Sequence, residues 1–327
     1  MNSHTTIDER SGEIRKATAV GGMWASAHLL CLRILGALAH LVHDRGMQRC
    51  TWILARHVFA PSHKAILRMT SGGLFKIRLT DGYWTRLLIP GYIYEPETWL
   101  VLRRSLEIPD VFFIDCGANI GYWSVLCSQF LPEKSVIAVE ASPSTYQQLT
   151  ENAQLNQNKF ETVWCALWDR DGESAVIVEH EERHAGSSIV NRREKIGKTG
   201  YTEHAVSTLT IDSIVDRYAK DRESKIVIKL DVEGAEIQSL RGASRSLRER
   251  DVLLWYEDHG QDAECRTSEF VLKDLGLLVL YFDERMCPHR MHSVEDVRAV
   301  KTDVHSGYNF VAFRPDSCFS RLFSVIS

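Results

Sequence analysis

The spacing of hydrophobic residues changes near position 110 and divides the chain into two parts. Residues 17–60 include a stretch rich in Ala, Leu and Gly and predict one or two amphipathic helices. Ile66–Met69 and Leu74–Leu79 are separated by Thr-Ser-Gly-Gly, which predicts a hairpin. A short helix is expected over Glu97–Leu106, where the apolar residues have helical spacing.

After residue 110, short apolar runs alternate with helical patterns. This alternation predicts a parallel sheet with helices on both faces. Asn309–Phe313 is expected to add a last strand, antiparallel to the rest. The other core strands are expected at Val111–Ile114, Ser135–Val139, Thr162–Cys165, Ile226–Leu230, Val252–Trp255 and Leu277–Phe282. Helices are expected at Ile120–Phe130, Ser144–Asn156, Ile211–Ala219, Ala235–Leu240 and Ser268–Leu275.

A long insertion separates the third and fourth of these core strands. Glu173–Val178 and Ala205–Leu209 have strand character and flank Glu181–Gly200, which is charged and contains three glycines. We expect the middle piece to be a mobile loop, either a lid at the ligand edge of the sheet or a solvated charge run.

Three regions follow from these patterns. An N-terminal helical extension covers residues 1–65, of which residues 1–16 are polar and expected to be frayed. Residues 66–110 form the hairpin and helix that lead into the core. Residues 111–327 form the main α/β domain, with the lid-like insertion at about 173–209.

Composition limits the class of protein. The chain has 327 residues, 44% of them hydrophobic and 25% charged, which is ordinary for a globular protein. A net charge of -4 provides no basic footprint for nucleic acid. The eight cysteines are scattered and give no secreted-type disulfide framework, so we expect a reducing, cytoplasmic location.

The apolar stretch over residues 17–42 resembles a membrane span at first sight. It contains His28, Arg33 and His40, and it has no clean run of about 18 apolar residues. It also starts late for a signal peptide and has no clear small-residue cleavage site. We expect a helical cap or a contact in an oligomer such as a homodimer, with association through residues 17–60 at a membrane surface as the alternative.

The most informative chemistry lies where two strands end. The strand beginning at Val111 ends in Asp115, and a turn containing Gly117 and Gly121 follows; these glycines would allow backbone to approach a ligand. Glu140 ends the next strand, where a carboxylate can accept hydrogen bonds from ribose hydroxyls. The G-x-x-x-G spacing differs from the G-x-G-x-x-G of dinucleotide-binding folds. A nucleoside-type ligand is therefore expected at this edge.

Several segments together resemble the FkbM family of S-adenosylmethionine-dependent methyltransferases. The most specific is Lys-Leu-Asp-Val-Glu-Gly-Ala-Glu over Lys229–Glu236, whereas the glycine motif fits class I methyltransferases broadly. The resemblance covers about Tyr92 to Phe313. The other matching segments are Tyr94–Pro96, Asp115–Gly121, Val139–Pro143, Ala166–Leu167, Asp171–Glu173, Thr208–Asp212 and Leu240–Ala243.

The resemblance implies a Rossmann-like class I sheet of seven strands, the last antiparallel, that binds S-adenosyl-L-methionine. Residues 111–327 would then be the methyltransferase domain. By motif, the turn after the first strand would surround the methionine and ribose, Glu140 would bind the ribose hydroxyls, and Glu95 would reach the methionine end. The implied cofactor-binding residues are Glu95, Asp115, Gly117, Ala118, Asn119, Gly121, Glu140, Ala141, Ala166 and Leu167, the last two beside the adenine.

Acidic residues after the fourth core strand are candidates for catalysis. Asp231, Glu233 and Glu236 crowd around a glycine at a helix start, where carboxylates also stabilise the helix dipole. Asp231 and Glu233 are candidates for removing the proton from a hydroxyl, whereas Glu236 is assigned to helix stabilisation or an ion pair. His259, after the fifth strand, is a third candidate base, or simply a loop histidine.

Two metal hypotheses arise from the same region of the sequence. The acid cluster offers oxygen ligands that suit magnesium. Cys287, His289 and His292, with Cys265, have a spacing that could bind zinc, but there is no C-x-x-C pair. We expect no metal, and we interpret residues 287–292 as an irregular polar connection before the last strand.

These observations predict an O-methyltransferase that moves a methyl group from S-adenosylmethionine to a hydroxyl of a small natural product or a sugar. The aromatic residues Tyr83, Trp84, Tyr92 and Tyr94 are candidates for the wall of an acceptor pocket, or for packing. One alternative is an NAD-dependent oxidoreductase or epimerase, which would need a three-glycine fingerprint and a Tyr-x-x-x-Lys dyad. The other is a non-catalytic module that binds the cofactor.

Overall fold

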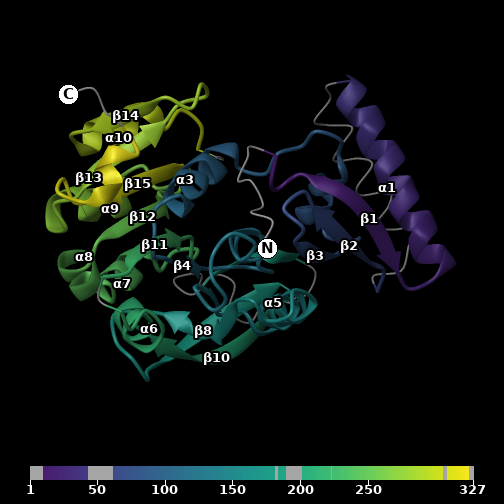
Figure 1. Ribbon diagram of the computed structural model, residues 1–327, viewed down its shortest axis with the longest axis horizontal. Helices are drawn as coiled ribbons and strands as arrows, with labels where there is room; N and C mark the ends of the chain where they lie inside the picture. Colours follow the sequence, from purple (N-terminus) through teal and green to yellow (C-terminus); the bar gives the residue numbers. More distant parts are fainter. Residues whose placement is uncertain are drawn as a thin grey trace.

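The computed structural model describes residues 10–42, 62–180, 183–188, 201–221, 223–304 and 308–323. Figure 1 shows a large α/β region that contains the central sheet and a smaller N-terminal region with its own sheet and one long helix. The two regions are in contact, because strand β3 (Leu74–Arg78) packs against helix α5 (Pro143–Leu155).

The central sheet has eight strands in the order β14-β13-β15-β12-β11-β4-β5-β6. Strand β15 (Asn309–Phe313) is antiparallel to both neighbours, as predicted from the sequence. The eighth strand, β14 (Pro288–Met291), was not expected; it pairs with β13 over residues interpreted as an irregular connection, so that interpretation was wrong. The remaining strands are β4 (Val111–Cys116), β5 (Val136–Glu140), β6 (Glu161–Trp164), β11 (Lys225–Leu230), β12 (Val252–Glu257) and β13 (Leu278–Phe282).

Burial on both faces explains why the strands have nearly continuous apolar sequences. All six residues of β4 are buried, and alternate side chains enter two separate hydrophobic clusters. Phe113 packs on the face that meets α4 (Tyr122–Cys127) and the N-terminal region. Phe112 and Ile114 pack on the opposite face, which is covered by α6 (Ile211–Tyr218), α7 (Glu236–Arg241) and α8 (Ser244–Glu249). Because successive side chains of a strand point to opposite faces of the sheet, one apolar run contributes to both hydrophobic clusters.

The order of the strands reverses beside β4. The chain runs from β4 outward to β5 and β6, and later returns on the other side of β4 through β11 and β12. Ligands of open α/β sheets bind outside the carboxyl ends of strands at such a reversal. The pairing of β4 with β11 places Asp115 beside Lys229 there, and Lys229 in turn beside Trp255.

The helices agree with the sequence pattern except at two short segments. Helices α8 (Ser244–Glu249) and α10 (Val294–Val300) were not predicted; the second begins with a capping box between Ser293 and Asp296. The expected helix over Ser268–Leu275 is α9 (Arg266–Glu269) continued by a π-helix, Phe270–Asp274. The other helices are α3 (Pro96–Leu106), α4 (Tyr122–Cys127), α5 (Pro143–Leu155), α6 (Ile211–Tyr218) and α7 (Glu236–Arg241), with short 3-10 helices at Trp84–Leu88 and Cys318–Arg321.

The N-terminal region corrects one expectation. The hairpin of β2 (Lys64–Met69) and β3 is present, and α1 (Met23–Val42) confirms a helix after residue 22. Residues Ile14–Val20, however, form a strand, β1, that pairs with β2, so helix over residues 17–20 and fraying up to residue 16 were wrong there. Backbone pairing along β2 and the packing of α1 on this sheet override the weak local pattern. The predicted helices over residues 43–60 lie outside the described residues.

The insertion is more regular than expected. The two strands predicted on either side of the loop are present as β8 (Ser174–His180) and β10 (Tyr201–Leu209), and they pair antiparallel. Residues Arg183–Ser188, expected as loop, form strand β9 because they hydrogen-bond to β8. The short strand β7 (Ala166–Leu167) completes this four-stranded sheet. The rest of the expected mobile loop lies outside the described residues.

None of the helices in the described parts of the chain is both long enough and apolar enough to cross a membrane.

Candidate functional site

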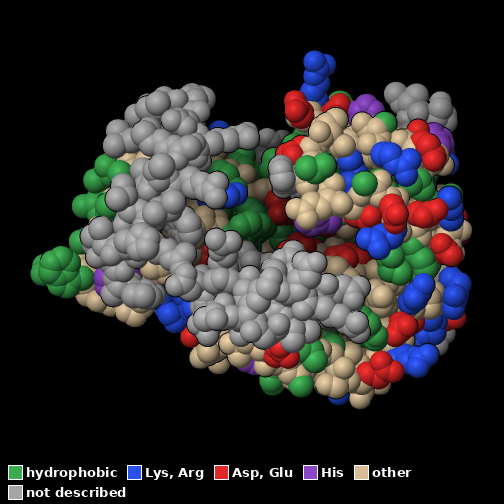
Figure 2. Space-filling model, turned by 180° about the vertical axis from the view of Figure 1, so that it is seen from behind, with side chains coloured by type: hydrophobic (Ala, Val, Ile, Leu, Met, Phe, Trp, Pro, Cys, Tyr) green, Lys and Arg blue, Asp and Glu red, His purple; other side chains and the backbone are tan. Residues whose placement is uncertain are grey.

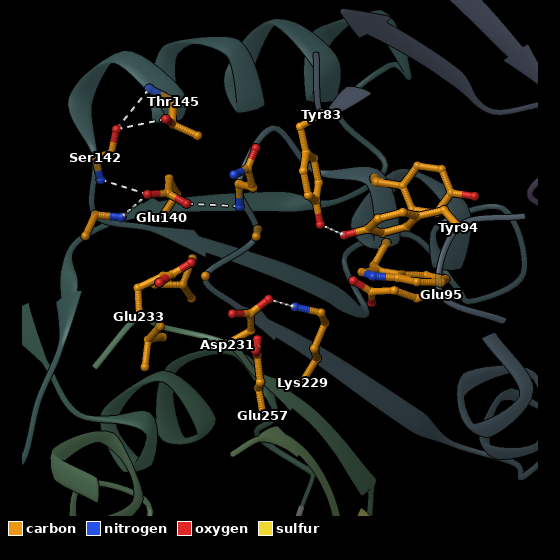
Figure 3. A pocket seen from close by; sticks show the side chains of 18 of the residues that line it. Tyr83, Tyr94, Glu95, Glu140, Ser142, Thr145, Lys229, Asp231, Glu233 and Glu257 are labelled. Carbon is orange, nitrogen blue, oxygen red and sulfur yellow. Dashed lines mark hydrogen bonds and ion pairs between the residues drawn. The ribbon is translucent and has the colours of Figure 1, made fainter. Parts of the chain in front are cut away.

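A pocket of about 420 Å³ lies at the carboxyl ends of β4, β5, β11 and β12. The face of the molecule in Figure 2 is hollowed near its centre, where hydrophobic and acidic side chains gather. Figure 3 shows the polar groups of the pocket, with Glu140 facing Asp231 and Glu257 across it. Residues from the N-terminal region, from the turns after the strands and from β8 all line it; they include Tyr83, Arg86, Tyr94, Glu95, Gly117, Ala118, Asn119, Glu140, Ala141, Leu167, Ile177, Lys229, Asp231, Glu233, Glu257 and Asn309.

The glycine turn is shaped by contacts within the protein. Gly117 has a φ of +76°, and a Cβ there would lie 1.8 Å from the backbone oxygen of Asp231. Gly121 has a φ of +91°, and a Cβ there would lie 2.6 Å from a methyl carbon of Leu149. The sequence argument attributed both glycines to ligand approach; the structure attributes them to positive φ and to the close approach of two turns and a helix. Gly117 lines the pocket, whereas Gly121 starts α4.

Glu140 is held by backbone donors at the end of β5. Its Oε1 accepts hydrogen bonds from the amides of Ala141 and Ser142 at 2.9 and 2.8 Å, and its Oε2 accepts one from Asn119 at 2.9 Å. Burial nevertheless raises the pKa of Glu140 to about 7, against the effect of these three donors. A carboxylate has about four lone-pair sites, so capacity remains for a hydroxyl donor.

Asp115 lies beneath the turn and is 1% exposed. Its Oδ2 accepts a hydrogen bond from Ser124 Oγ at 2.6 Å, while Oδ1 is buried without a hydrogen-bond partner among the described residues. Burial raises the pKa of Asp115, and nearby Lys229 opposes that change. Asp115 is not among the residues that line the pocket, so it supports the glycine turn from beneath.

Lys229, Asp231 and Glu257 form the charged centre of the pocket. Lys229 Nζ lies 3.0 Å from Asp231 Oδ2 and 5.0 Å from the centre of the Trp255 ring. Burial lowers the pKa of Lys229, but Asp231, Asp115 and Glu95 outweigh it and raise the pKa above its ordinary value. Burial and the adjacent carboxylates of Asp231 and Glu233 raise the pKa of Glu257. Glu257 therefore holds its proton at neutral pH beside the ion pair.

The N-terminal region supplies the opposite wall. The hydroxyls of Tyr83 and Tyr94 are 2.6 Å apart, and Trp84 Nε1 donates to Asn119 Oδ1 at 3.2 Å, which ties this wall to the glycine turn. Glu95, in the left-handed region at the start of α3, accepts from Thr98 Oγ1 at 3.1 Å. Burial raises the pKa of Glu95 to about 7.

The insertion closes the end of the pocket near Glu140. Leu167 and Ala141 line it, and Ile177 of β8 joins them. Ala166 is fully buried in the small cluster with Ile177 and Val206 and is not among the lining residues. Ser142 caps α5 and also hydrogen-bonds Glu179 of β8, which joins the insertion to the turn after β5.

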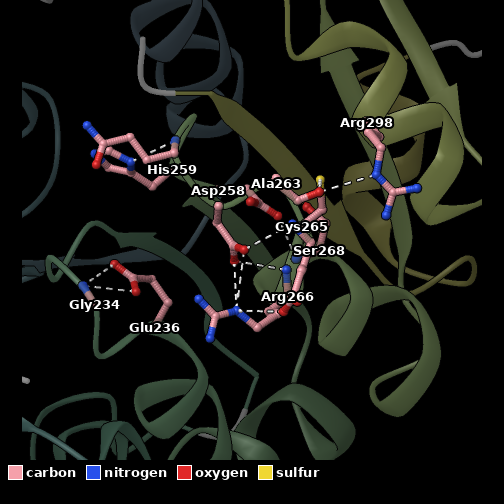
Figure 4. A network of polar contacts seen from close by, with 12 residues as sticks. Gly234, Glu236, Asp258, His259, Ala263, Cys265, Arg266, Ser268 and Arg298 are labelled. Carbon is pink, nitrogen blue, oxygen red and sulfur yellow. Dashed lines mark hydrogen bonds and ion pairs between the residues drawn. The ribbon is translucent and has the colours of Figure 1, made fainter. Parts of the chain in front are cut away.

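Figure 4 shows where Glu236 and His259 lie. Both carboxylate oxygens of Glu236 accept from the amide of Gly234 at 3.0 Å, just before the start of α7. Glu233 lines the pocket. His259 is exposed; its Nδ1 accepts from the amide of Gln261 at 3.2 Å, and it is not among the residues that line the pocket.

The residues considered for zinc are separated. Cys265 is buried at the start of α9, whereas Cys287 is exposed and His289 Nε2 lies 3.0 Å from Asp283 Oδ2. Within the described ranges, no group of three His, Cys, Asp or Glu side chains has the geometry to hold a metal ion.

A comparison with protein-family models matches residues 115–280, about half of the chain, to the methyltransferase FkbM domain. The chain belongs to the FkbM family of methyltransferases. The matched range contains the glycine turn, Glu140 and the whole Lys229–Glu236 segment on which the resemblance was based.

Curated relatives are similar over a more limited range. The chain is 27% identical over 148 residues to Methyltransferase 1 of Beauveria bassiana, which covers 41% of this chain and 58% of that protein. It is 26% identical over 156 residues to methyltransferase sdnD of Sordaria araneosa, covering 40% and 60%. It is 25% identical over 154 residues to the hexuronic acid methyltransferase AglP of Haloferax volcanii, covering 47% and 58%. The chain thus spans less than two thirds of the length of these relatives.

Among solved structures, a methyltransferase FkbM from Methylobacillus flagellatus KT is similar, with a TM-score of 0.36 and 17% identity. The match covers 64% of this chain and 46% of that one.

Membership of the FkbM family implies S-adenosyl-L-methionine as the methyl donor. The residues present fit such a group, because Glu140 has acceptor capacity at the end of β5 and Gly117, Ala118 and Asn119 line the pocket beside it. The first alternative, an NAD-dependent oxidoreductase or epimerase, does not agree with the family.

Sequence reasoning missed two central groups of this FkbM-family site. Lys229 was part of the recognised segment but was given no role, and Glu257 was not singled out. The sequence does carry a signal for Lys229: it is a lysine near the end of an otherwise apolar, buried strand, and a buried cation needs an anionic partner. The signal for Glu257 is its position at the end of a buried strand. Asp115 and Glu140 lie at or near the ends of their strands in the same way.

Proposed function

We propose that this FkbM-family protein is an O-methyltransferase that acts on a hydroxyl of a sugar or another small polyhydroxylated molecule. The observation that carries the proposal is one pocket with two unlike sides. One side offers Glu140 and the glycine turn for a nucleoside, and the other offers the Lys229–Asp231 ion pair beside Glu257.

The donor half is assigned to residues of β4, β5 and the turns that follow. Glu140 accepts hydrogen bonds from the ribose hydroxyls, and Ala141 and Leu167 flank the adenine. Gly117, Ala118 and Asn119 form the floor, while Glu95 binds the methionine end. Asp115, Gly121 and Ala166 act indirectly, because none of them lines the pocket; Asp115 and Gly121 shape the turn, and Ala166 supports the adenine wall.

The acceptor half is assigned to Asp231 and its neighbours. When bound, S-adenosylmethionine supplies an electrophilic methyl group on a sulfonium. Asp231 would take the proton of the acceptor hydroxyl as the hydroxyl oxygen bonds to that methyl group, whose bond to sulfur breaks to leave S-adenosylhomocysteine. Lys229 holds the carboxylate of Asp231 in place. Glu257 retains its proton and hydrogen-bonds the acceptor, and Glu233 at the rim contacts it.

The acceptor class rests on the wall of the pocket and on one relative. Tyr83 and Tyr94 present aromatic faces and hydroxyls, which suit a sugar ring. Exposed Arg86 at the pocket can pair with a carboxylate, and the relative AglP is named as a hexuronic acid methyltransferase. A glycoside that bears a hexuronic acid is therefore the first acceptor to test.

The test combines binding with turnover. Calorimetry should detect binding of S-adenosylmethionine and none of NAD. Incubation with methyl-labelled cofactor and a panel of hydroxylated acceptors, with and without a carboxylate, should give a product heavier by one methyl group in mass spectrometry. Binding of NAD instead would overturn the assignment, and cofactor binding with no turnover on any hydroxylated acceptor would favour the non-catalytic module.

A further inference from the structure

Helix α1 presents an apolar face outward, away from the sheet on which it packs. Met23, Trp24, Leu30 and Ile34 are 78%, 69%, 59% and 51% exposed. Figure 1 shows α1 at the outer edge of the N-terminal region, and in the reversed view of Figure 2 hydrophobic side chains lie along that edge. These four residues are called the outer face of α1.

The same helix is apolar on its inner face as well. Ala25, Leu29 and Leu32 are buried, Leu29 and Leu32 within the core that includes β2 and β3. A helix that is hydrophobic all round is normally buried all round. The outer face of α1 therefore has the composition of a contact surface rather than of a solvated helix face.

The net charge of the N-terminal region indicates which kind of partner suits the outer face of α1. Residues 14–94 contain eleven Lys and Arg and only two Asp and Glu, a net charge of +9. The whole chain carries -4, so the remainder carries -13. Arg33 lies beside Leu30 and Ile34 and is exposed, as are Arg15 and Lys16 of β1, and α1 contains no acidic residue.

We propose that the outer face of α1, with the basic residues around it, binds the surface of an anionic phospholipid bilayer. Trp24 has the apolar body and polar edge that suit the headgroup boundary, and Arg33 can extend its guanidinium to phosphate while its stem stays in apolar surroundings. A second copy of the chain would bring another region of charge +9 against the first, so charge favours the bilayer over self-association.

The experiment is co-sedimentation of the full chain with vesicles of phosphatidylcholine alone or with about 30% phosphatidylglycerol. We expect binding to the anionic vesicles at least about tenfold tighter than to the neutral ones, and weakened as salt is raised. Equal binding to both kinds of vesicle, or no binding to either, would overturn the proposal.

Two variants separate the apolar and the basic contributions. Leu30→Ser should weaken vesicle binding severalfold, and the double variant Arg15→Gln, Lys16→Gln should reduce the preference for anionic vesicles by at least about tenfold. Val304→Ser is the matched control, because Val304 is 58% exposed but lies outside the N-terminal region, and it should bind as the unmodified chain does.

Self-association is measured in parallel, by sedimentation velocity over a range of protein concentrations. A dimer that Leu30→Ser dissolves, together with no vesicle binding, would assign the outer face of α1 to a second copy and overturn the proposal. Circular dichroism melting of each variant shows whether the fold is intact. If Leu30→Ser melts early, Trp24→Ser is used in its place with the same expectation.

Discussion

At the scale of single residues, Glu140 connects the geometry to cofactor affinity. Its ionised form accepts hydrogen bonds, and burial raises its pKa to about 7, so protonation removes acceptor capacity as the pH falls below 7. We expect the Kd for S-adenosylmethionine to rise by up to about tenfold per pH unit below 7. Calorimetry between pH 6 and 8.5 measures this.

The variants Glu140→Gln and Glu95→Gln separate the two carboxylates that titrate in this range. Glu140→Gln should bind the donor weakly at every pH, with a flat profile, whereas Glu95→Gln should keep the dependence. A pH profile that stays steep in Glu140→Gln and becomes flat in Glu95→Gln would contradict this prediction and attribute the pH dependence to Glu95.

The second residue-scale prediction concerns the base. Asp231→Asn keeps the size of the side chain but removes the charge paired with Lys229. We expect kcat to fall by about 10²–10⁴-fold, while the Kd for the donor stays within about threefold, because the donor half is untouched. His259→Ala should change neither value, since His259 does not line the pocket. Turnover that survives in Asp231→Asn and is lost in His259→Ala would reverse the assignment.

The third prediction concerns the glycine turn. Gly117→Ala places a methyl group against the backbone oxygen of Asp231 and keeps a φ of +76°. Gly172→Ala is a matched control, because Gly172 has a φ of +75° with nothing within 4 Å of the added Cβ. We expect both variants to lose stability through backbone strain, about 1–3 kcal/mol, and Gly117→Ala to lose clearly more. Urea unfolding compares them; equal losses would mean that the contact with Asp231 is unimportant.

Some of these residues could be found from the sequence, and the physical reason separates them from the rest. Glu140 and Asp231 sit where apolar strands stop, so an acidic residue there stands out by position. Lys229 is inside a strand, and its importance comes from pairing with β4 on one side and β12 on the other. The partner on β4, Asp115, is more than a hundred positions away in the sequence, so the local pattern marks Lys229 as a buried cation but does not name its partners.

At the scale of elements, β1 shows the same limit. Local pattern favoured helix over residues 17–20, yet these residues form an edge strand because β2, about fifty positions later, offers hydrogen-bond partners. The same holds for strand β9 of the insertion, which is a strand because its residues hydrogen-bond to β8. By contrast, the buried core strands were predicted within one or two residues, because burial on both faces makes them continuously apolar.

The docking of α1 yields a prediction about acidity. His28 of α1 is buried with its Nδ1 3.3 Å from Nδ1 of His63, just before β2. Burial, and then the proximity of His63, lowers the pKa of His28 to about 4 from an ordinary value of 6.5. The folded state therefore binds fewer protons than the unfolded state between these values. Stability is complete above about pH 6.5 and is lost as the pH falls towards 4.

The loss is at most about 1.4 kcal/mol per pH unit from this group. Urea unfolding followed by circular dichroism from pH 7.5 to 5 measures it in the unmodified chain. His28→Gln removes the titrating group and should flatten the profile, and His63→Gln should flatten it less. If the free energy of unfolding of His28→Gln depends on pH as steeply as that of the unmodified chain, the charge of His28 does not affect the docking of α1.

At the scale of the whole molecule, the site belongs to both regions of the fold. The central sheet supplies Glu140 and Asp231, while residues before β4, such as Tyr83 and Glu95, build the facing wall and hydrogen-bond the glycine turn through Trp84. Family resemblance predicted a Rossmann-like sheet whose last strand is antiparallel. It did not predict how the N-terminal sheet meets the core, because one partner in that contact with α5, strand β3, lies outside the matched range.

A ligand that fills a pocket shared by two regions should stabilise both. At a concentration 100 times its Kd, S-adenosylmethionine adds about 2.7 kcal/mol to the free energy of unfolding. With the unfolding entropy expected for 327 residues, this raises the Tm by about 4 °C. Calorimetric melting should show one transition that shifts as a unit, and NAD at the same concentration should leave it in place. Two transitions, of which only the later shifts, would mean that the N-terminal region folds independently and contributes little to donor binding.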